Sequence, residues 1–539
     1  MNDKGVSALQ VFRYPEDERE YALDHRAYSA VAIGVFDGVH RAHREVIGRI
    51  VGIGRLIPTV LTFADSPAGL PKQAVPLATG RQKEALLERL GVQHVIEMDF
   101  DSVSQLSAKR FVDVILCELL QARVVVCGSN FHFGAGGVAG VTELQDLCEQ
   151  RGILLTVVPT VFDGGEAISS SRIRRLLADG QVREASRLLG YAYGFTAPVS
   201  HGKQLGQTAG FPTINQKLPH ETTPLRHGVY ASVAVVEGRS VLGVTNVGHK
   251  PTVGGTELLA ETHLLDFSGN LYAKRVTVYP VRFLRDERTF ADTEALFAQV
   301  AADCEAVRAM YRPTGMIRAV LFDFDDTLHS RVEAWRQFSL QFVRELFPEA
   351  DETEQQQKAR ELWEMGGCGR GFRPEEYVDI PYETLFGELK EKWGLSDRVD
   401  TLVRRCHRMF AGCVQVFADT VPSLRKLKEA GLTVGIITNG RSFLQNRKLY
   451  YSGLLPELDC AVVAGDEKVS KPDPELFRRT ALRLGIPPED CAYVGDNPLA
   501  DLAGAREAGM LPLYLDRYGE RLAAPAYGDL SAIINSIIL

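Results

Sequence analysis

The segment Ala319-Val-Leu-Phe-Asp-Phe-Asp-Asp-Thr-Leu328 constrains the fold of this chain more than any other segment. It predicts an apolar strand that ends in two carboxylates two residues apart, Asp323 and Asp325. Residues two apart in a strand point the same way, and the following turn can aim both side chains at one point. Because neighbouring anions repel each other, the pair predicts a cation, and Mg²⁺ prefers carboxylate oxygens. A nucleophile beside an acid/base suits phosphoryl transfer through an aspartyl-phosphate. The alternative is an acidic turn after a buried strand.

Later segments place further polar side chains at the ends of predicted strands. The apolar run 432–438 ends in a hydroxyl and an amide that can hold phosphate oxygens, and the run 492–495 is followed by two carboxylates. A lysine between these runs supplies a cation. Ligands of open α/β sheets bind at the carboxyl ends of strands, so we expect these groups to converge on Asp323 and Asp325. They are Thr438, Asn439, Lys471, Asp496 and Asp501.

These segments resemble the four motifs of the haloacid-dehalogenase-like (HAD) phosphatase superfamily over residues 316–539. The resemblance implies that Asp323 is the nucleophile and Asp325 the acid/base, and that Mg²⁺ is held by these two residues and Asp496. It also implies that Thr438, Asn439 and Lys471 bind phosphate and that Asp501 steadies the metal or Lys471. Because the dehalogenase branch lacks the second carboxylate, Asp325 indicates a phosphatase.

The residues between the first two of these motifs are rich in helix formers, and so long a stretch does not stay unstructured inside a compact domain. We expect a helical cap over about 331–418 that excludes water and selects the substrate. Its aromatic side chains either line the substrate pocket or, as helical aromatics usually do, form the core of the cap. They are Trp335, Phe338, Trp363, Phe372, Tyr377, Tyr382 and Phe386.

At 539 residues the chain is too long for one core, and about three domains are expected. The net charge of −8 disfavours nucleic acid and anionic membranes as partners. Nine scattered cysteines without a Cys-x-x-Cys pair indicate free thiols in a reducing compartment. The segment Met1–Val6 has no apolar run, and no run approaches the ~18 apolar residues that span a bilayer. We therefore expect a cytoplasmic protein.

The N-terminal region has a strand, a glycine turn and two histidines, His40 and His43, at the start of a predicted helix. Helix starts offer free N–H groups to phosphate, so both histidines could contact a nucleotide during adenylyl transfer. A His-x-x-His pair alone could equally be a helix cap. The segment Ser169-Ser170-Ser171-Arg172-Ile-Arg174 adds hydroxyls and guanidiniums at another helix start, a good phosphate clamp.

Residues 1–185 resemble the adenylyltransferase half of the bacterial bifunctional riboflavin kinase/FAD synthetase. The resemblance implies ATP and FMN as substrates. It places six residues near the nucleotide: His40, His43, Asn130, Ser169, Ser170 and Arg174.

Several positions depart from that family. Ala42 replaces a glycine that lets phosphate approach the backbone, Ser66 replaces a histidine, and Asn130 replaces an aspartate. The basic residues that follow Gly134 are missing, which weakens polyphosphate binding and transition-state stabilisation together. The alternatives are a retained FAD synthetase and a scaffold that binds nucleotide or flavin without turnover.

Residues 186–310 change to short alternating strands with glycine turns, which predict a small closed β-barrel. In Gly206-Gln-Thr-Ala-Gly210-Phe-Pro212-Thr213-Ile-Asn215, the glycines allow a nucleotide to lie against backbone and Pro212 fixes an extended path. Thr213 and Asn215 then project to one side and can coordinate Mg²⁺ and phosphate.

The segment Leu259-Ala-Glu261-Thr-His263 places a carboxylate and an imidazole on the same strand face. Each element alone could be structural, since a glutamate on a half-exposed strand usually faces water. Together with Asn246–Thr252 and Phe283–Phe290 they resemble the riboflavin kinase domain. The resemblance implies Glu261 as general base, with Thr213 and Asn215 at the metal and phosphates.

Arg312–Gly315 predicts a short linker before the phosphatase region. We therefore expect an α/β multidomain protein, with a Rossmann-like nucleotidyltransferase domain (1–185), a riboflavin-kinase β-barrel (186–310) and a HAD Rossmann-like domain with a helical cap (316–539). The expected activity is riboflavin kinase with Mg²⁺ and ATP, giving FMN. FMN adenylylation to FAD would be weak or absent, and the phosphomonoesterase would act on a flavin-pathway phosphate.

The first expected phosphatase substrate is 5-amino-6-(5-phosphoribitylamino)uracil, because hydrolysis of FMN beside an FMN-making kinase wastes ATP. FMN is second and an unrelated sugar phosphate third. A flavin-binding sensor with a degenerate nucleotidyltransferase is the alternative from another class.

Overall fold

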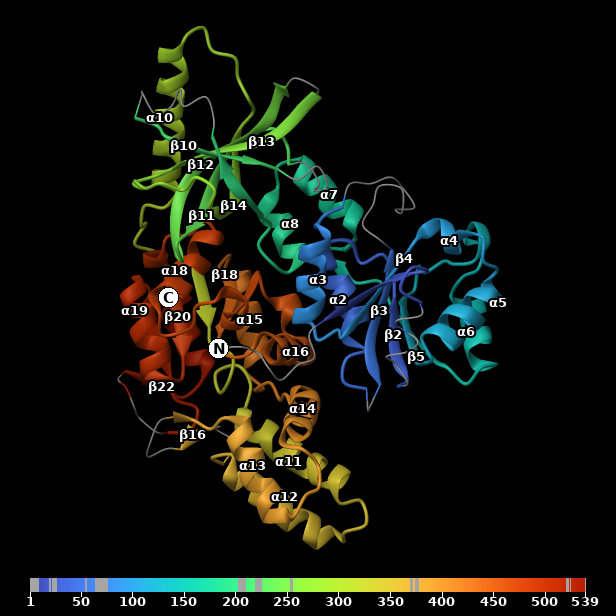
Figure 1. Ribbon diagram of the computed structural model, residues 1–539. Helices are drawn as coiled ribbons and strands as arrows, with labels where there is room; N and C mark the ends of the chain where they lie inside the picture. Colours follow the sequence, from blue (N-terminus) through green and yellow to red (C-terminus); the bar gives the residue numbers. More distant parts are fainter. Residues whose placement is uncertain are drawn as a thin grey trace.

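The chain folds into three bodies, each built on its own sheet (Figure 1). The α/β multidomain class and its three expected folds are confirmed. Within the described ranges, no helix combines the length and apolarity that a bilayer crossing requires. The computed structural model describes residues 9–18, 21, 27–53, 56–63, 76–201, 210–218, 225–252, 255–368, 372–373, 378–519, 523 and 525–538.

The first body is a parallel sheet in the order β1-β4-β3-β2-β5-β6. Its strands are β1 (Gln10–Tyr14), β2 (Ser29–Ile33), β3 (Ile57–Phe63), β4 (His94–Met98), β5 (Ala122–Gly128) and β6 (Leu154–Val158). The order reverses between β2 and β5, which is where open α/β sheets bind ligands at their carboxyl edge. Helices α2 (Arg41–Gly48) and α3 (Gly80–Arg89) follow β2 and β3.

Two helices, α7 (Ser170–Ala178) and α8 (Val182–Leu189), connect this sheet to the next body. Their buried faces, with Ile173 and Leu188, belong to the same hydrophobic cluster as Tyr230 and Val278 of the barrel. The two connecting helices therefore share one hydrophobic cluster with the barrel.

The second body is a closed barrel in the order β10-β13-β12-β11-β14-β9. Helix α10 (Thr293–Met310) packs on its outer surface through Cys304 and Val307. The side chains of Ala260, Thr262 and Leu264 are buried, whereas the alternate residues of the same strand are only half-buried. The barrel strands are β9 (Phe195–Ser200), β10 (Thr213–Lys217), β11 (Gly228–Val236), β12 (Arg239–Thr252), β13 (Gly255–Leu264) and β14 (Arg275–Arg285).

The third body is a parallel sheet in the order β19-β18-β15-β20-β21-β22. The segment that ends in Asp323 forms the central strand, between the two strands that end near Thr438 and Asp496. All three strand endings therefore lie on one edge of the sheet. The strands are β15 (Ala319–Phe322), β18 (Thr433–Thr438), β19 (Cys460–Val463), β20 (Cys491–Gly495), β21 (Leu511–Leu515) and β22 (Ala526–Tyr527).

Four helices form a separate lobe beyond this edge (Figure 1). They are α11 (Arg331–Leu346), α12 (Glu352–Met365), α13 (Tyr382–Trp393) and α14 (Val399–Phe410). Trp335, Phe338 and Phe386 are buried in their common core, and Trp363 and Tyr382 pack against it. The aromatic residues thus mostly build the lobe itself. The side chains of Phe372 and Tyr377 lie outside the described residues.

Helix α16 (Ser442–Ser452) joins the third body to the first. Nη2 of Arg447 donates to the Val51 carbonyl at 3.1 Å, and the Tyr450 hydroxyl donates to the Glu45 carbonyl at 3.4 Å. A Cβ at Gly91 would lie 2.0 Å from the Phe443 ring, so the close approach of α16 to the first body requires glycine at this position. The first and third bodies are therefore in close contact.

The third body also packs on the barrel. Oε1 of Glu475 accepts a hydrogen bond from the Ser240 amide at 2.7 Å, and Nη2 of Arg479 donates to the Gly238 carbonyl at 2.7 Å. Glu475 and Arg479 belong to α18 (Pro474–Arg483). In the connection, the amide and hydroxyl of Thr314 each bond to Asp490 at 2.8 Å.

Candidate active sites

Three carboxylates meet at the carboxyl edge of the third sheet. Oxygens of Asp323, Asp496 and Asp501 lie within 4.8 Å of one another, and Asp323 is 6% exposed. Burial raises the pKa of Asp323 to about 7. Burial, with Asp323 and Asp501 nearby, raises the pKa of Asp496 well above its usual range. The donor set is all oxygen, which fits Mg²⁺, and a cation there would relieve the repulsion.

Lys471 supplies the positive charge beside these carboxylates. Its Nζ lies 2.5 Å from Oδ1 of Asp323 and 2.6 Å from Oδ1 of Asp501. Burial lowers the pKa of Lys471, but the two carboxylates outweigh it and raise that pKa well above its usual range. The lysine is therefore charged where an attacked phosphate would arrive.

Asn439 and Thr438 occupy the neighbouring strand end, but their polar atoms are engaged in the protein. The amide of Asn439 accepts from the Lys471 N–H at 2.9 Å and donates to its carbonyl at 3.0 Å. Both side-chain amide atoms of Asn439 thus hold the Lys471 segment, and its contact with phosphate stays a prediction. Thr438 is 1% exposed, and its hydroxyl accepts from Gln445 at 3.2 Å.

Asp325 lines the same cavity and is close enough to Asp323 to raise its pKa, but it is not one of the three clustered carboxylates; its predicted place beside the metal stays a prediction. Its carboxylate pairs with Lys448 and accepts from Nε2 of His329 at 2.8 Å and Nε2 of Gln445 at 2.6 Å. Burial would raise the pKa of Asp325, but Lys448 and His329 outweigh it and hold that pKa well below its usual range. The side chain that joins Asp323 and Asp496 is Asp501 instead.

These residues line a cavity of about 840 Å³ that the helical lobe covers from one side. Trp335, Tyr382 and Phe410 of the lobe lie on its wall together with Lys471 and Asp496. A phosphate ester with a sizeable organic group would fit this space.

The second site lies on the outer face of the barrel. Glu261 on β13 pairs in register with Asn215 on β10 and Asn246 on β12, so the three side chains form a row across neighbouring strands. Asn246 donates to Glu287 at 3.2 Å. The strand pairing therefore places a carboxylate among amides on one surface.

The rim of this row is formed by the segment before β10. Gly210 adopts a left-handed conformation with φ of 81°, and the Pro212 carbonyl lies 2.9 Å from Nδ1 of His263. Thr213 pairs in register with His263 and is exposed. Residues 206–209 of the glycine-rich motif lie outside the described residues.

The third site lies where the order of the first sheet reverses. His40 caps α2, and its Nδ1 accepts from the His43 amide at 3.3 Å. The two rings stack with centroids 3.5 Å apart. Burial lowers the pKa of His40 to about 3 and that of His43 well below its usual range. Both imidazoles are therefore neutral at pH 7, and Asn130 lies in an exposed turn after β5 at the same sheet edge.

The predicted phosphate clamp contributes to the fold around this site. Ser169 caps α7 by accepting from the Arg172 amide at 3.2 Å, and Ser170 donates to the Asp37 carbonyl at 3.1 Å. Arg174 forms an ion pair with the Asp37 carboxylate. These groups hold the loop before His40 in place.

Comparisons with known proteins match a different family to each of three regions of the chain. Family models match residues 23–172 (FAD synthetase), 189–311 (riboflavin kinase) and 317–509 (haloacid dehalogenase-like hydrolase). A bifunctional riboflavin kinase/FMN adenylyltransferase of Escherichia coli (strain K12) is 36% identical over 281 residues, which are 51% of this chain and 90% of that protein. The chain belongs to the bifunctional riboflavin kinase/FMN adenylyltransferase family. It is an enzyme in which transferase domains are fused to a hydrolase domain.

Other members and neighbours are similar over comparable lengths. The family member from Pseudomonas fluorescens is 37% identical over 54% of this chain and 95% of its own. A crystal structure from Streptococcus pneumoniae, described as a macrolide-efflux protein, is 28% identical, with a TM-score of 0.50 over 56% of this chain and 99% of that chain. The family relatives therefore account for about half of the chain.

Gln445, Lys448 and His329 around Asp325 were not expected from the sequence. Asn246 and Glu287 lie in segments that carry the kinase resemblance, but no role was expected for either residue. A helical reading of α16 could have found Gln445 and Lys448, because residues three apart lie on one helix face. His329 is four residues after Asp325 in a turn, a spacing without a recognisable pattern.

Proposed function

We propose that the barrel phosphorylates riboflavin with ATP to give FMN, with Glu261 as general base. Glu261 takes the proton of the ribityl primary hydroxyl as that oxygen attacks the γ-phosphorus of ATP. Thr213 and Asn215 would hold the phosphates, and Thr213 would hold Mg²⁺. Mg²⁺, when bound with ATP, neutralises charge on the phosphates. Family membership and the in-register row of Asn215, Glu261 and Asn246 support this assignment.

The nucleotidyltransferase domain binds ATP and FMN and forms FAD slowly. Neutral His40 and His43 can each donate one hydrogen bond to a phosphate but contribute no charge. Arg174, a cation of the proposed clamp, already pairs with Asp37. The segment after Gly134 offers Ala135, Gly136 and Gly137 in place of cations. Fewer charges around the triphosphate lower the rate.

The hydrolase domain cleaves a phosphomonoester through an aspartyl-phosphate. Asp323 attacks phosphorus as the alcohol leaves, and Lys471 stabilises the transferring oxygens. Asp325 is the acid/base: Lys448 and His329 keep it ionised in the free protein, so it takes a proton from the hydrolytic water and passes that proton to the leaving alcohol of the next cycle. Asp323 and Asp496 would hold Mg²⁺, which neutralises the phosphate charge, and Asp501 orients Lys471. The buried cluster of three carboxylates beside Lys471 is the observation that carries this assignment.

The substrate of the hydrolase is a flavin-pathway phosphate, first 5-amino-6-(5-phosphoribitylamino)uracil, with FMN second and a sugar phosphate third. Fusion to a kinase that makes FMN favours a precursor over FMN, whose hydrolysis would waste ATP. A cavity of about 840 Å³ with aromatic walls suits a ring attached to a ribityl chain. Phosphate release should be measured for the three compounds side by side. Release from the sugar phosphate alone would refute the flavin-pathway assignment.

A further inference from the structure

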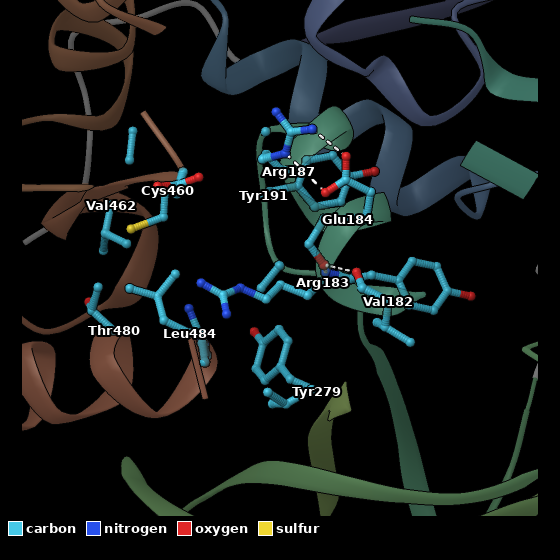
Figure 2. Close-up of a pocket in the computed structure, with 18 of the residues that line it drawn as sticks. Val182, Arg183, Glu184, Arg187, Tyr191, Tyr279, Cys460, Val462, Thr480 and Leu484 are labelled. Atoms are coloured by element: carbon cyan, nitrogen blue, oxygen red, sulfur yellow. Dashed lines mark hydrogen bonds and ion pairs between the residues drawn. The ribbon is translucent and has the colours of Figure 1, made fainter. Parts of the chain in front are cut away.

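A second large cavity, of about 860 Å³, lies where the three bodies meet. Its wall includes Arg44 from α2, Arg183 and Tyr191 from the α8 region, Tyr279 from the barrel and Cys460 from β19. Figure 2 shows the Arg183 side chain extending from α8 toward Cys460 and Leu484 of the hydrolase domain. Nη2 of Arg183 reaches Oγ1 of Thr433 at 2.9 Å. None of the proposed catalytic residues lines this cavity.

Several arginines on this wall are neutralised inside the protein. Arg187 pairs with Asp163 and Glu184, and Arg483 pairs with Glu467. Three lining carboxylates, Glu184, Asp466 and Glu467, take part in ion pairs, whereas Asp179 and Asp459 on the same wall form none among the described residues. Paired residues therefore leave little net charge for a ligand to meet.

Three other guanidiniums on the wall have no such partner. Across the part of the chain that the structure describes, Arg44, Arg183 and Arg282 form no ion pair with a carboxylate. Arg44 is deeply placed, and burial lowers its pKa more than the nearby Tyr191 and Asp466 raise it. A buried guanidinium without a close ion-pair partner is costly, because its desolvation is only partly compensated. The wall thus presents three guanidiniums outside ion pairs, and guanidiniums suit phosphate oxygens.

Aromatic rings stand beside these cations. The Arg483 guanidinium lies 4.0 Å from the centroid of the Tyr279 ring, and the Arg44 guanidinium lies 5.7 Å from that of Tyr191. Stacked guanidinium and phenol planes offer flat surfaces for a heteroaromatic ring. The volume also lies in the range of cavities that hold cofactor-sized molecules.

We propose that this cavity binds a nucleotide, a phosphate ester carrying a planar heteroaromatic ring, at a site separate from the three active sites. The lining residues 446–484 belong to the hydrolase domain, whereas the family relatives match only about half of this chain. The complete site is therefore specific to the fused protein. Adenine and flavin nucleotides share the required chemistry.

An occupant would touch residues that support two active sites. The Tyr191 hydroxyl donates to the Gly38 carbonyl at 2.9 Å, and Nε of Arg44 donates to the Val39 carbonyl at 3.2 Å, both in the loop before His40. Asn446 on the cavity wall is adjacent to Gln445, which contacts Asp325. Binding here can thus act on the adenylyltransferase and hydrolase sites together.

The test is calorimetric titration of the full chain with ADP, FMN and orthophosphate in separate experiments. Arg183→Glu and Arg282→Gln are the test variants, since both side chains are exposed and neither is catalytic. Arg478→Gln is the matched control, because Arg478 is a half-buried arginine outside the cavity wall whose guanidinium donates to the Glu507 carbonyl. Circular dichroism confirms that each variant is folded.

We expect wild type and Arg478→Gln to bind one more equivalent of ADP or of FMN than Arg183→Glu. Arg282→Gln should weaken that extra event at least tenfold, and the rate of FMN formation should be the same in all four proteins. Whether ADP or FMN shows the additional binding event identifies the heteroaromatic ring that the cavity accepts. Equal stoichiometry and affinity in all four proteins would overturn the proposal, as would an extra event with orthophosphate only. FMN formation is measured on the same samples. If it is normal, either of these outcomes contradicts only the proposed cavity site and leaves the kinase assignment intact.

Discussion

Nζ of Lys471 lies 2.5 Å from Oδ1 of Asp323, joining two segments that are 148 residues apart in the sequence. The pair brings the proposed nucleophile and the cation for its substrate into one buried group. Lys471 lies just before α18, and its backbone is held by Asn439, which follows β18 beside β15.

Replacing the nucleophile should separate the two chemistries of the chain. Asp323→Asn should lower phosphomonoester hydrolysis at least ~10³-fold, because an amide cannot form the aspartyl-phosphate. FMN formation should be unchanged, since the barrel is a separate body. Both rates are measured on one preparation with p-nitrophenyl phosphate and with riboflavin plus ATP. Residual hydrolysis near the wild-type rate would contradict the assignment of Asp323.

The general base of the kinase is tested by the reciprocal change. Glu261→Gln keeps the shape but cannot accept a proton, so FMN formation should fall by roughly 10²–10⁴-fold. Glu237→Gln is the matched control on the same barrel, where Glu237 pairs with Lys274 on the surface at 2.7 Å. Equal losses in the two variants would argue against a catalytic role for Glu261.

Stability without metal should depend on pH through the carboxylate cluster. The pKa of Asp323 is about 7 in the fold and 3.8 when unfolded, so the fold favours the protonated form. The contribution of Asp323 to the free energy of unfolding is complete below pH 4 and is lost as the pH rises toward and through 7. The raised pKa of Asp496 changes stability in the same direction.

This dependence is measured as the melting temperature of wild type relative to Asp323→Asn. In EDTA, raising the pH from 6 to 8 should lower that difference by roughly 3–5 °C. Mg²⁺ should remove the loss at pH 8, because it stabilises the ionised carboxylates. A difference that rises with pH in EDTA would show that the cluster is not under charge repulsion.

The contacts of Asp325 predict a hydrolase defect that does not touch the nucleophile. Lys448→Met removes the buried cation from Asp325 and should lower hydrolysis by roughly 10–100-fold, because the acid/base loses its fixed position. Leaving that carboxylate buried should also cost about 3–5 kcal/mol of unfolding free energy. Lys426→Met, at an exposed site, is the control for both assays. Wild-type hydrolysis in Lys448→Met would mean that Asp325 needs no positioning cation.

The departures from the family in the nucleotidyltransferase domain can be reversed. Ala42→Gly with Ser66→His should raise FAD formation, because the backbone becomes accessible to phosphate and an imidazole returns. The Ala42 side chain packs against the hydrophobic cluster of α7 and α8, so glycine should cost about 1 kcal/mol. FAD is measured by chromatography. An unchanged rate would locate the loss in the missing cations after Gly134.

The convergence of the endings of β15, β18 and β20 was predictable from the sequence, because apolar runs that stop at polar side chains in a parallel sheet mark its functional edge. Thr438 and Asp496 follow from this rule. The bonds of the Asn439 side chain to the Lys471 backbone could not be predicted, since an amide can bond to phosphate or to backbone equally well. The partners of Asp325 could not be predicted either, because Lys448 and Gln445 belong to a helix whose orientation depends on tertiary packing. The contacts between bodies likewise leave no local pattern, as Arg447 and Val51 are almost 400 residues apart.

The connection between barrel and hydrolase has a practical consequence. Thr314 is bonded to Asp490 through both its amide and its hydroxyl, and the Tyr311 hydroxyl donates to the Leu482 carbonyl at 2.8 Å. The joint is thus a docked surface and not a loose tether. A protease that severs the peptide between these anchors would leave the two fragments associated, so they would co-elute during gel filtration.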